Sequence, residues 1–198
     1  MSEQSAPPVI TIYEMAFASS NKTDAILVVD GKKLHVNKTL LSCHSDYFNT
    51  LFNSDFKEKS MQEIPIEDVN FEDFATVLSL VHPNPIEPTI ENSERLLQLA
   101  DRFLLPAAKR HVELSISCSR ISRIRKLELA DKYNLEILLE HILMGYSKKE
   151  DFNNMYNATI DFTDHTRSKL FQRYFYLADK GKQDRSSNNS SYGGSAWQ

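Results

Sequence analysis

The stretch from Asp24 to Phe52 constrains the fold of this chain more than any other part of the sequence. Ala25 to Val29 is almost fully apolar and rich in β-branched residues, which predicts a strand buried on both sides. The dipeptide Asp30-Gly31 follows, and this pair readily accepts the positive φ angles of a two-residue hairpin turn. Leu34 and Val36 then alternate with polar residues, so the return strand is expected to have one buried and one solvated face.

Two short helices are predicted immediately after this hairpin. Asn37 is a good N-cap, and Leu40 and Leu41 can turn inward from the helix behind it. Ser45 can cap a second helix, whose apolar residues face the same core: Tyr47, Phe48, Leu51 and Phe52. The local order is therefore hairpin, helix, helix.

This succession of elements resembles the first half of a BTB/POZ domain. The resemblance extends over roughly Asp24 to Ile116, about half of the chain, and it implies an α+β fold. In that fold a small mixed sheet is flanked by helices and closed by a helical hairpin. Asn37 stands where the first family helix commonly has a histidine, and an Asn cap does the same structural job. The resemblance is carried by Asp24, the apolar strand, the turn, Leu34, Lys38, Leu40-Leu41, Ser45 and Tyr47-Phe48.

The segment after Phe52 is predicted to hold one more strand and a helix. Glu63 to Ile66 is expected to be a short strand, and Pro65 restricts it to a sheet edge or a strand end because proline cannot donate a ladder hydrogen bond. Asn70 can cap the helix, with Asp73 in a capping-box-like position. The sequence HPNP at 82–85 ends the helix. One helix face is apolar and consists of Phe71, Phe74, Leu78 and Val81.

From Asn92 onwards the chain is predicted to be helical, and it contains an internal repeat. The sequence LQLADRFLL at 97–105 recurs as LELADKYNL at 127–135. Such a period is typical of a helix-turn-helix unit that buries its apolar face on a neighbour. Pro106 suits the first turn of the second helix in copy one, and Ser119 can cap the start of copy two. The second copy resembles the start of the BACK-like or three-box segment of ubiquitin-ligase adaptors.

These signals divide the chain into four parts. Residues 1–21 are expected to be a flexible N-terminal segment, in which Val9 to Tyr13 is compatible with a short strand, although a surface linker is the interpretation we favour. Residues 22–117 form the BTB/POZ-like domain, and residues 119–180 form a helical BACK-like extension. Residues 181–198 have the composition of a disordered tail. The last helix, from Thr163 or Asp164, has an aromatic stripe expected to be core packing: Leu170, Phe171, Tyr174 and Ala178.

Composition argues against several classes of protein. With 41% hydrophobic and 25% charged residues the chain can bury a core, and its net charge of −4 gives no electrostatic case for nucleic-acid binding. The N-terminus has no signal-peptide pattern, and no stretch approaches the ~20 apolar residues that span a bilayer, so no membrane partner is expected. Two distant cysteines suit a reducing compartment. We therefore expect a cytoplasmic or nuclear protein.

No enzyme, cofactor or metal signature is present in the sequence. The five glycines form no phosphate-binding loop and no nucleophile elbow, and the six histidines have no metal-ligand spacing. We therefore predict no catalytic, cofactor-binding or metal-binding residues. Cys43 is expected to be a small core residue. The densest basic cluster is Arg120, Arg123, Arg125 and Lys126. Spacing by threes places Arg120, Arg123 and Lys126 on one helix face, which is expected to be solvated, with a phosphate or acidic-partner site as the alternative.

Asp24 and Lys38 form the first candidate site. In isolation each is an ordinary surface charge. The resemblance places them at the acidic and basic positions of a charged pocket beside the BTB dimer interface, with Lys38 in place of the more frequent Arg. Lysine offers a point charge and not a planar fork, so a structural Asp24–Lys38 contact is favoured over a ligand-reading role. The dimer face implied by the resemblance also includes Leu40 and Leu41.

Phe56 and Glu58 form the second candidate site. A lone phenylalanine in a run of Asn, Ser, Asp, Lys and Glu either packs into the core of its own domain or binds a partner protein. Spacing alone leaves both alternatives open. The resemblance favours the partner, because BTB adaptors carry a hydrophobic-x-Glu motif in the loop before the strand that here ends at Ile66. In that family the motif docks on cullin-3. The Tyr-x-Gly-like turn that commonly follows the next family helix is replaced here by HPNP.

The sequence as a whole favours a non-enzymatic, dimeric protein-interaction module. The segments HPNPIEPT and LADRFLLPAAKRH are most similar to the BTB half of MATH–BTB adaptors. The resemblance implies a substrate adaptor that pairs with itself or another BTB protein and recruits an unidentified target to a cullin-3 RING ubiquitin ligase. The alternative is a BTB scaffold that assembles transcriptional or cytoskeletal complexes without a cullin.

Overall fold

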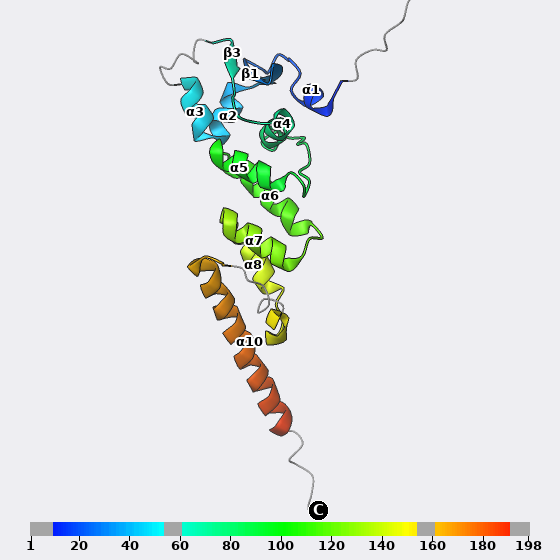
Figure 1. The fold of residues 1–198 in the computed structure, drawn as a ribbon, viewed down its shortest axis with the longest axis vertical. Helices are drawn as coiled ribbons and strands as arrows, with labels where there is room; N and C mark the ends of the chain where they lie inside the picture. Colours follow the sequence, from blue (N-terminus) through cyan, green and yellow to red (C-terminus); the bar gives the residue numbers. More distant parts are fainter. Residues whose placement is uncertain (1–9, 54–60, 154–160, 191–198) are drawn as a thin grey trace, which may run out of the picture. The chain divides into compact units, whose positions relative to one another are not determined.

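The computed structural model of this chain describes residues 10–53, 61–153 and 161–190. The chain divides into two compact units, Met1–Ser115 and Ile116–Gln198, and each is described by itself (Figure 1). The first unit contains a small mixed sheet and helices, so the predicted α+β fold is confirmed. The second unit is helical in its described residues.

The sheet of the first unit is built on the predicted hairpin. Strands β1 (Ala25–Val29) and β2 (Lys32–Val36) pair in antiparallel fashion. Asp30 and Gly31 have φ angles of 50° and 76°, as a two-residue turn with the twist of its strands requires. Strand β3 (Glu63–Pro65) pairs with β1 in parallel, so β1 is central in the order β2-β1-β3. Pro65 therefore lies on an edge strand, as predicted.

Helices α2 (Lys38–His44) and α3 (Asp46–Asn53) begin at the predicted caps. The backbone N–H of Leu40 donates to Asn37 Oδ1 over 2.7 Å, and that of Phe48 donates to Ser45 Oγ over 3.1 Å. The Ser45 hydroxyl in turn donates to the carbonyl of Phe103 over 2.6 Å. One short side chain thus caps α3 and ties it to a residue 58 positions away.

An aromatic cluster around Phe103 forms the centre of the first unit. Phe103 follows helix α5 (Ser93–Arg102) and is 1% exposed. Its ring stacks against that of Phe48 on α3, with centroids 5.8 Å apart. The rings of Phe74, on α4 (Phe71–Ser79), and of Tyr47 both lie 5.0 Å from it. Helices α3, α4 and α5 therefore meet at one residue.

Helix α4 is held to α5 by an ion pair between the buried Asp73 and the exposed Arg95. Asn70 caps α4 as predicted, accepting from the N–H of Asp73 over 3.0 Å. The Asp73 side chain does not complete a capping box. Its carboxylate, 5% exposed, accepts from Arg95 on α5, with Oδ2 2.5 Å from Nε and Oδ1 3.2 Å from Nη2. A charge-assisted, bidentate pair outcompetes the local contact.

The N-terminal segment forms a helix and not the short strand with which its sequence is compatible. Helix α1 (Ile12–Ala16) begins at Thr11, which exchanges capping-box hydrogen bonds with Glu14, and this local pair favours helix over strand for the described residues. The segment is fastened at Phe17, which is 2% exposed and whose carbonyl accepts from the N–H of His35 over 3.1 Å. The ring of Phe17 also lies 5.2 Å from that of His82, just after α4.

Both copies of the repeat are helical hairpins. The first is α5 and α6 (Pro106–Cys118), and the second is α7 (Arg123–Tyr133) and α8 (Glu136–Met144). The turns match in detail, because Leu104 and Asn134 have positive φ angles of 49° and 51°. The next residue of each copy donates its N–H to an alanine carbonyl over 2.8 Å, Leu105 to Ala100 and Leu135 to Ala130. The repeat thus encodes the same helix-ending motif twice.

The second copy starts later than predicted. Ser122, and not Ser119, caps α7 by accepting from the N–H of Arg125 over 3.1 Å. The Ser119 hydroxyl instead donates to the carbonyl of Ile116 over 2.6 Å, which uses it at the end of α6. Arg120 therefore lies outside the helix, and the predicted shared helix face of Arg120, Arg123 and Lys126 is wrong.

The chain continues through a short 3₁₀ helix, η2 (Lys149–Phe152), to helix α10 (Asp164–Ser190). Thr163 precedes α10 as predicted, and its N–H and hydroxyl both donate to the carboxylate of Asp131 on α7. The expected disordered tail from Gly181 is wrong as far as Ser190, because the helix extends to that residue. Extending an existing helix costs far less than nucleating one, which outweighs the poor helix propensity of the Ser/Asn residues. Residues 191–198 lie outside the described residues.

The contact of His82 with Phe17 predicts a pH dependence of stability. Burial lowers the pKa of His82 below its usual value near 6.5. As the pH falls below about 6.5, His82 therefore binds a proton more readily in the unfolded chain than in the folded one. The free energy of unfolding decreases until the pH drops below the lowered pKa of His82 in the folded state. We expect the melting temperature to drop between about pH 7.5 and 5.5, and to drop less in a His82→Gln variant. Equal drops in the two proteins would contradict this prediction.

Candidate functional site

The first candidate site lies where the hairpin meets helix α2. Asp24 directly precedes β1, and its N–H donates to the carbonyl of Val36 over 3.0 Å at the end of β2. Asn37 follows, and besides capping α2 it donates from Nδ2 to the carbonyl of Lys22 over 2.7 Å. The start of β1 and the start of α2 are therefore held together by hydrogen bonds from both sides.

Asp24 and Lys38 are in contact, but through the backbone of Lys38. Asp24 Oδ1 accepts from the Lys38 N–H over 2.7 Å. This N–H is one of the amides at a helix start that have no partner within the helix, and a carboxylate there is also favoured by the helix dipole. The Lys38 ammonium lies elsewhere, 5.7 Å from the ring centroid of Phe52. Asp24 is thus a second cap of α2, supplied from 14 residues away.

The two leucines of the candidate dimer face have different environments. Leu41 is 0% exposed and belongs to the core of its own unit, so it has no surface to give to a partner. Leu40 is half-buried, and it is followed one turn later by Cys43, which is exposed. The prediction that Cys43 is a core residue is therefore wrong, because α2 turns only Leu41 fully inward. Leu40 and Cys43 define the outward face of α2.

The second candidate site, Phe56 and Glu58, lies outside the described residues. The structure describes the two ends of its segment, α3 up to Asn53 and β3 from Glu63. Both ends are fixed to the core next to the segment, since Phe52 is 4% exposed and Ile64 is 1% exposed.

The basic cluster of the second unit is more than a solvated face. The Arg123 guanidinium lies 4.5 Å from the ring centroid of Tyr146. The Lys126 ammonium donates to the carbonyls of Ser117 and Ser119, over 2.6 and 2.8 Å, where it satisfies the end of α6. The Arg125 guanidinium pairs with Glu128 over 2.9 Å. These contacts assign structural roles to Arg123, Arg125 and Lys126.

Within the described part of the chain, no His, Cys, Asp and Glu side chains gather in a group that could hold a metal ion. The described helices also include none with the length and apolar character needed to cross a bilayer.

Sequence reasoning missed one further feature, the exposure of aromatic residues on α10, because the 3.6-residue pattern marks a face of the helix but not what lies against it.

The capping role of Asp24 is testable by substitution. Asp24→Ala should lower the free energy of unfolding by about 1 kcal/mol, since losing a cap acceptor costs ~0.5–2 kcal/mol. Asp24→Asn keeps an acceptor oxygen and should retain most of this stability. Lys38→Met, the matched control, should change stability little because only its N–H contacts Asp24. Urea unfolding measures all three, and a Lys38→Met loss as large as that of Asp24→Ala would mean an ion pair instead of a cap.

Comparisons with known proteins bear on the first unit above all. A "BTB/POZ domain-containing protein" of Caenorhabditis elegans is 42% identical over 125 residues, which are 62% of this chain and 40% of that protein. The "BTB and MATH domain-containing protein 36" of the same organism is 31% identical over 160 residues, 79% of this chain and 50% of that protein. This chain thus spans at most about half the length of these curated relatives.

A similarity to a solved structure and a family model complete the comparison. The structure of the BTB domain of human gigaxonin aligns with this chain at 22% identity and a TM-score of 0.41. The alignment covers 57% of this chain and 96% of the gigaxonin chain. The family model described as "BTB/POZ domain" matches residues 13–120, more than half of the 198 residues. This chain therefore belongs to the BTB/POZ domain family.

Proposed function

We propose that this chain is a non-enzymatic, dimeric adaptor that brings a target protein to a cullin-3 RING ubiquitin ligase. The observation that carries the proposal is the place of Phe56-Lys57-Glu58 in a BTB/POZ domain. This sequence lies between the end of α3 and the start of β3, where the hydrophobic-x-Glu motif of BTB adaptors is found. Its relatives with MATH domains are consistent with this class.

The residues that flank the Phe56 segment belong to the core of the first unit. Phe52, before the segment, is 4% exposed, and Ile64, after it, is 1% exposed. The turn after α4 has HPNP in place of the Tyr-x-Gly-like turn of the family, and the ring of its His82 lies against that of Phe17. The cullin contact proposed here therefore depends on Phe56 and Glu58.

The adaptor proposal predicts that Phe56→Ala weakens cullin binding and leaves stability unchanged. An aromatic interface anchor typically contributes ~2 kcal/mol or more, roughly thirty-fold in affinity for the cullin-3 N-terminal region. On this proposal the Phe56 ring is exposed in the free protein, so its removal leaves no cavity and the melting temperature should stay unchanged. The matched control is Phe52→Ala, which empties a core site and should cost ~3–5 kcal/mol of stability. Calorimetric titration and thermal melts measure the two quantities.

Two outcomes count against the adaptor. Unchanged cullin affinity in Phe56→Ala would remove this residue from the interface. A wild-type chain that binds no cullin-3 at all would overturn the proposed function and leave the scaffold interpretation.

We also propose that the dimer forms through the outward face of α2. The face offers Leu40 and Cys43 beside the Asp24 cap, and α2 buries only Leu41 within its own unit. Stable homodimer interfaces often exceed about 2,000 Å² and have an apolar centre, so neighbouring elements must contribute as well. A charge placed at the centre of such an interface is costly because it loses its hydration.

Light scattering at low micromolar concentration should give a mass near twice the 22.8 kDa of one chain. Leu40→Glu should give a monomer. It should remain folded, since position 40 is in the first turn of α2, where an acidic side chain favours the helix. Leu114→Glu, at an exposed leucine of α6, is the control and should remain dimeric. A wild-type monomer, or a dimer that survives Leu40→Glu, would contradict this interface.

A further inference from the structure

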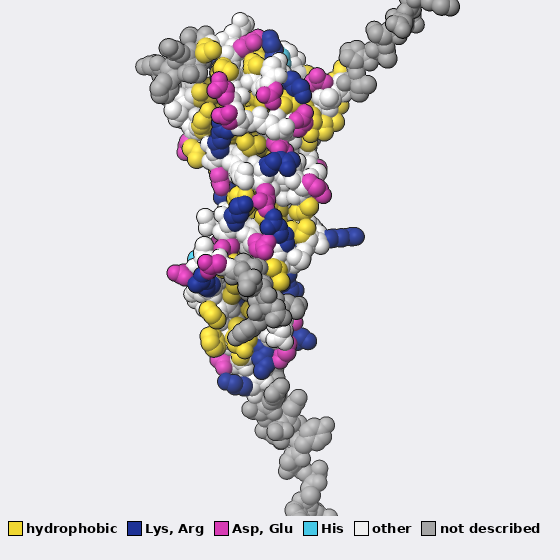
Figure 2. Space-filling model, viewed as in Figure 1, with side chains coloured by type: hydrophobic (Ala, Val, Ile, Leu, Met, Phe, Trp, Pro, Cys, Tyr) yellow, Lys and Arg dark blue, Asp and Glu magenta, His cyan; other side chains and the backbone are white. Residues whose placement is uncertain are grey.

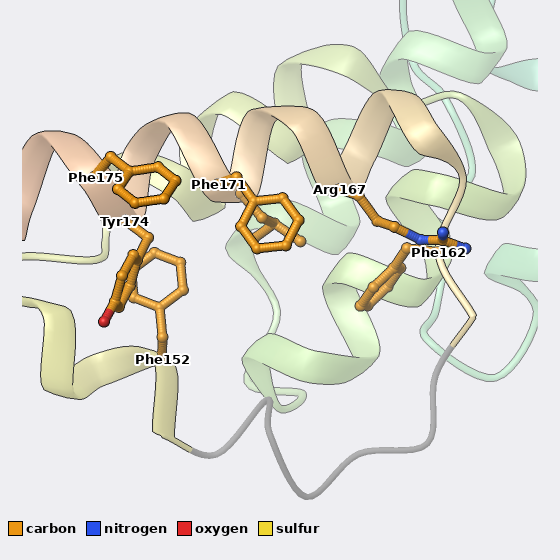
Figure 3. Close-up of a pocket in the computed structure, with 7 residues that line it drawn as sticks. Phe152, Phe162, Arg167, Phe171, Tyr174 and Phe175 are labelled. Atoms are coloured by element: carbon orange, nitrogen blue, oxygen red, sulfur yellow. The ribbon is translucent and has the colours of Figure 1, made fainter.

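Helix α10 of the second unit presents an aromatic groove that is only partly filled. A pocket of about 450 Å³ opens between α10, Phe152 of η2 and Phe162 (Figure 3). On α10 its lining residues form two rows spaced by four residues, Arg167, Phe171 and Phe175 in one and Leu170 and Tyr174 in the other. Such spacing produces a continuous stripe on a helix.

The sequence predicts core packing for the aromatic stripe of Leu170, Phe171, Tyr174 and Ala178, and this prediction is only partly right. Leu170 is buried, and Tyr174 packs its ring 5.6 Å from that of Phe152. Phe171 and Phe175 are 61% and 62% exposed. Two adjacent exposed phenylalanines beside a hollow are unusual on a soluble surface and typical of a protein-binding site. Figure 2 shows hydrophobic side chains gathered over α10, with Lys and Arg side chains next to them.

The same face of α10 continues into a basic pocket. A second hollow, of about 480 Å³, shares Tyr174 with the first and extends along α10 past Leu177 to Gly181. Its walls carry four lysines and one glutamate, Lys148, Lys149, Lys180, Lys182 and Glu150. Lys182 pairs with Asp179 over 3.5 Å, and the nearby Asp151 carboxylate accepts from Ser147 and the Lys148 backbone. Among the residues that line this pocket, the four lysines outnumber the single glutamate.

We propose that this groove binds an acidic segment of another protein, with aromatic or leucine side chains entering the aromatic pocket and carboxylates facing the lysines. Charge complementarity selects this occupant: aromatic anchors supply affinity through desolvation, and the lysines set the sign of the charge that follows them. The chain's own residues 191–198, SYGGSAWQ, contain no acidic side chain and do not match. The basic pocket is short and includes Glu150, which disfavours a nucleic-acid backbone.

The proposal goes beyond cullin docking, because it supplies a recognition surface for a target in the second unit. It requires neither Phe56 nor a cullin. Its failure would leave cullin binding untouched, and a failure of cullin binding would leave this groove in place. The test therefore uses the full-length chain without any cullin.

The probe is a fluorescein-labelled peptide in which two phenylalanines, four positions apart, are followed by a run of glutamates. Fluorescence anisotropy should show binding that weakens with added salt, as expected for contacts between exposed charges. Phe171→Ala, Phe175→Ala and the charge reversals Lys149→Glu and Lys180→Glu should each weaken it about tenfold or more, as loss of an interface anchor or reversal of a charge does. Their melting temperatures should not change, because all four side chains are exposed.

Matched controls separate the groove from the rest of the surface. Tyr176→Ala removes an aromatic ring of α10 that is 59% exposed but does not line the groove, and Lys22→Glu reverses a charge on the first unit. Both should bind the peptide like the wild type. A peptide with lysines in place of the glutamates, or serines in place of the phenylalanines, should bind at least about tenfold more weakly.

Several results would overturn the proposal. They are no binding of the acidic peptide by the wild type, equal binding of the lysine peptide, or equal losses in the control and groove variants. Binding of a single-stranded oligonucleotide that Phe171→Ala and Lys180→Glu abolish, with none of the peptide, would assign the groove to nucleic acid. Self-association lost in Phe171→Ala, again without peptide binding, would assign it to a second copy of the chain.

Discussion

The packing around Phe103 is the interaction on which the rest of the first unit depends. Its ring touches Phe48, Phe74 and Tyr47, and its carbonyl accepts the hydroxyl of Ser45. Burying a phenylalanine contributes about 1.5–3 kcal/mol, and each favourable ring pair adds about 0.5–1.5 kcal/mol. Because these partners come from different helices, the cluster fixes α3, α4 and α5 relative to one another. The Asp73–Arg95 pair then sets the rotation of α4 against α5.

This core leaves helix α2 at the surface of its unit. Only Leu41 anchors α2 by burial, so its orientation also depends on the hydrogen bonds of Asn37 and Asp24 at its first turn. Capping from two sides satisfies the amides that would otherwise need water. The outward face with Leu40 and Cys43 is thereby held in place without being fully buried in the core, as the proposed dimer surface requires.

The two units carry different kinds of surface. The first has the BTB/POZ fold and the outward face of α2, which we propose as the dimer surface. The second ties its last helix to α7 and α8 through polar contacts, in which Asp131 accepts from Thr163 and Glu136 pairs with Lys169. Further along α10 the Arg173 guanidinium donates to the carbonyl of Tyr146, while Phe171 and Phe175 remain exposed beside the groove that we propose as a binding site.

The sequence by itself determined the features that depend on neighbours in the chain. The Asp30-Gly31 turn, the caps at Asn37, Ser45 and Asn70, and the repeated hairpin ending at Leu104 and Asn134 all use hydrogen bonds within a few residues. Only the tertiary structure decided that Asp24 binds the backbone of Lys38, that Asp73 turns to Arg95, and that Leu41 is core while Cys43 and Phe171 are exposed. Each of these outcomes depends on which distant element lies against the residue, and hydrophobic spacing specifies a helix face without specifying what covers it.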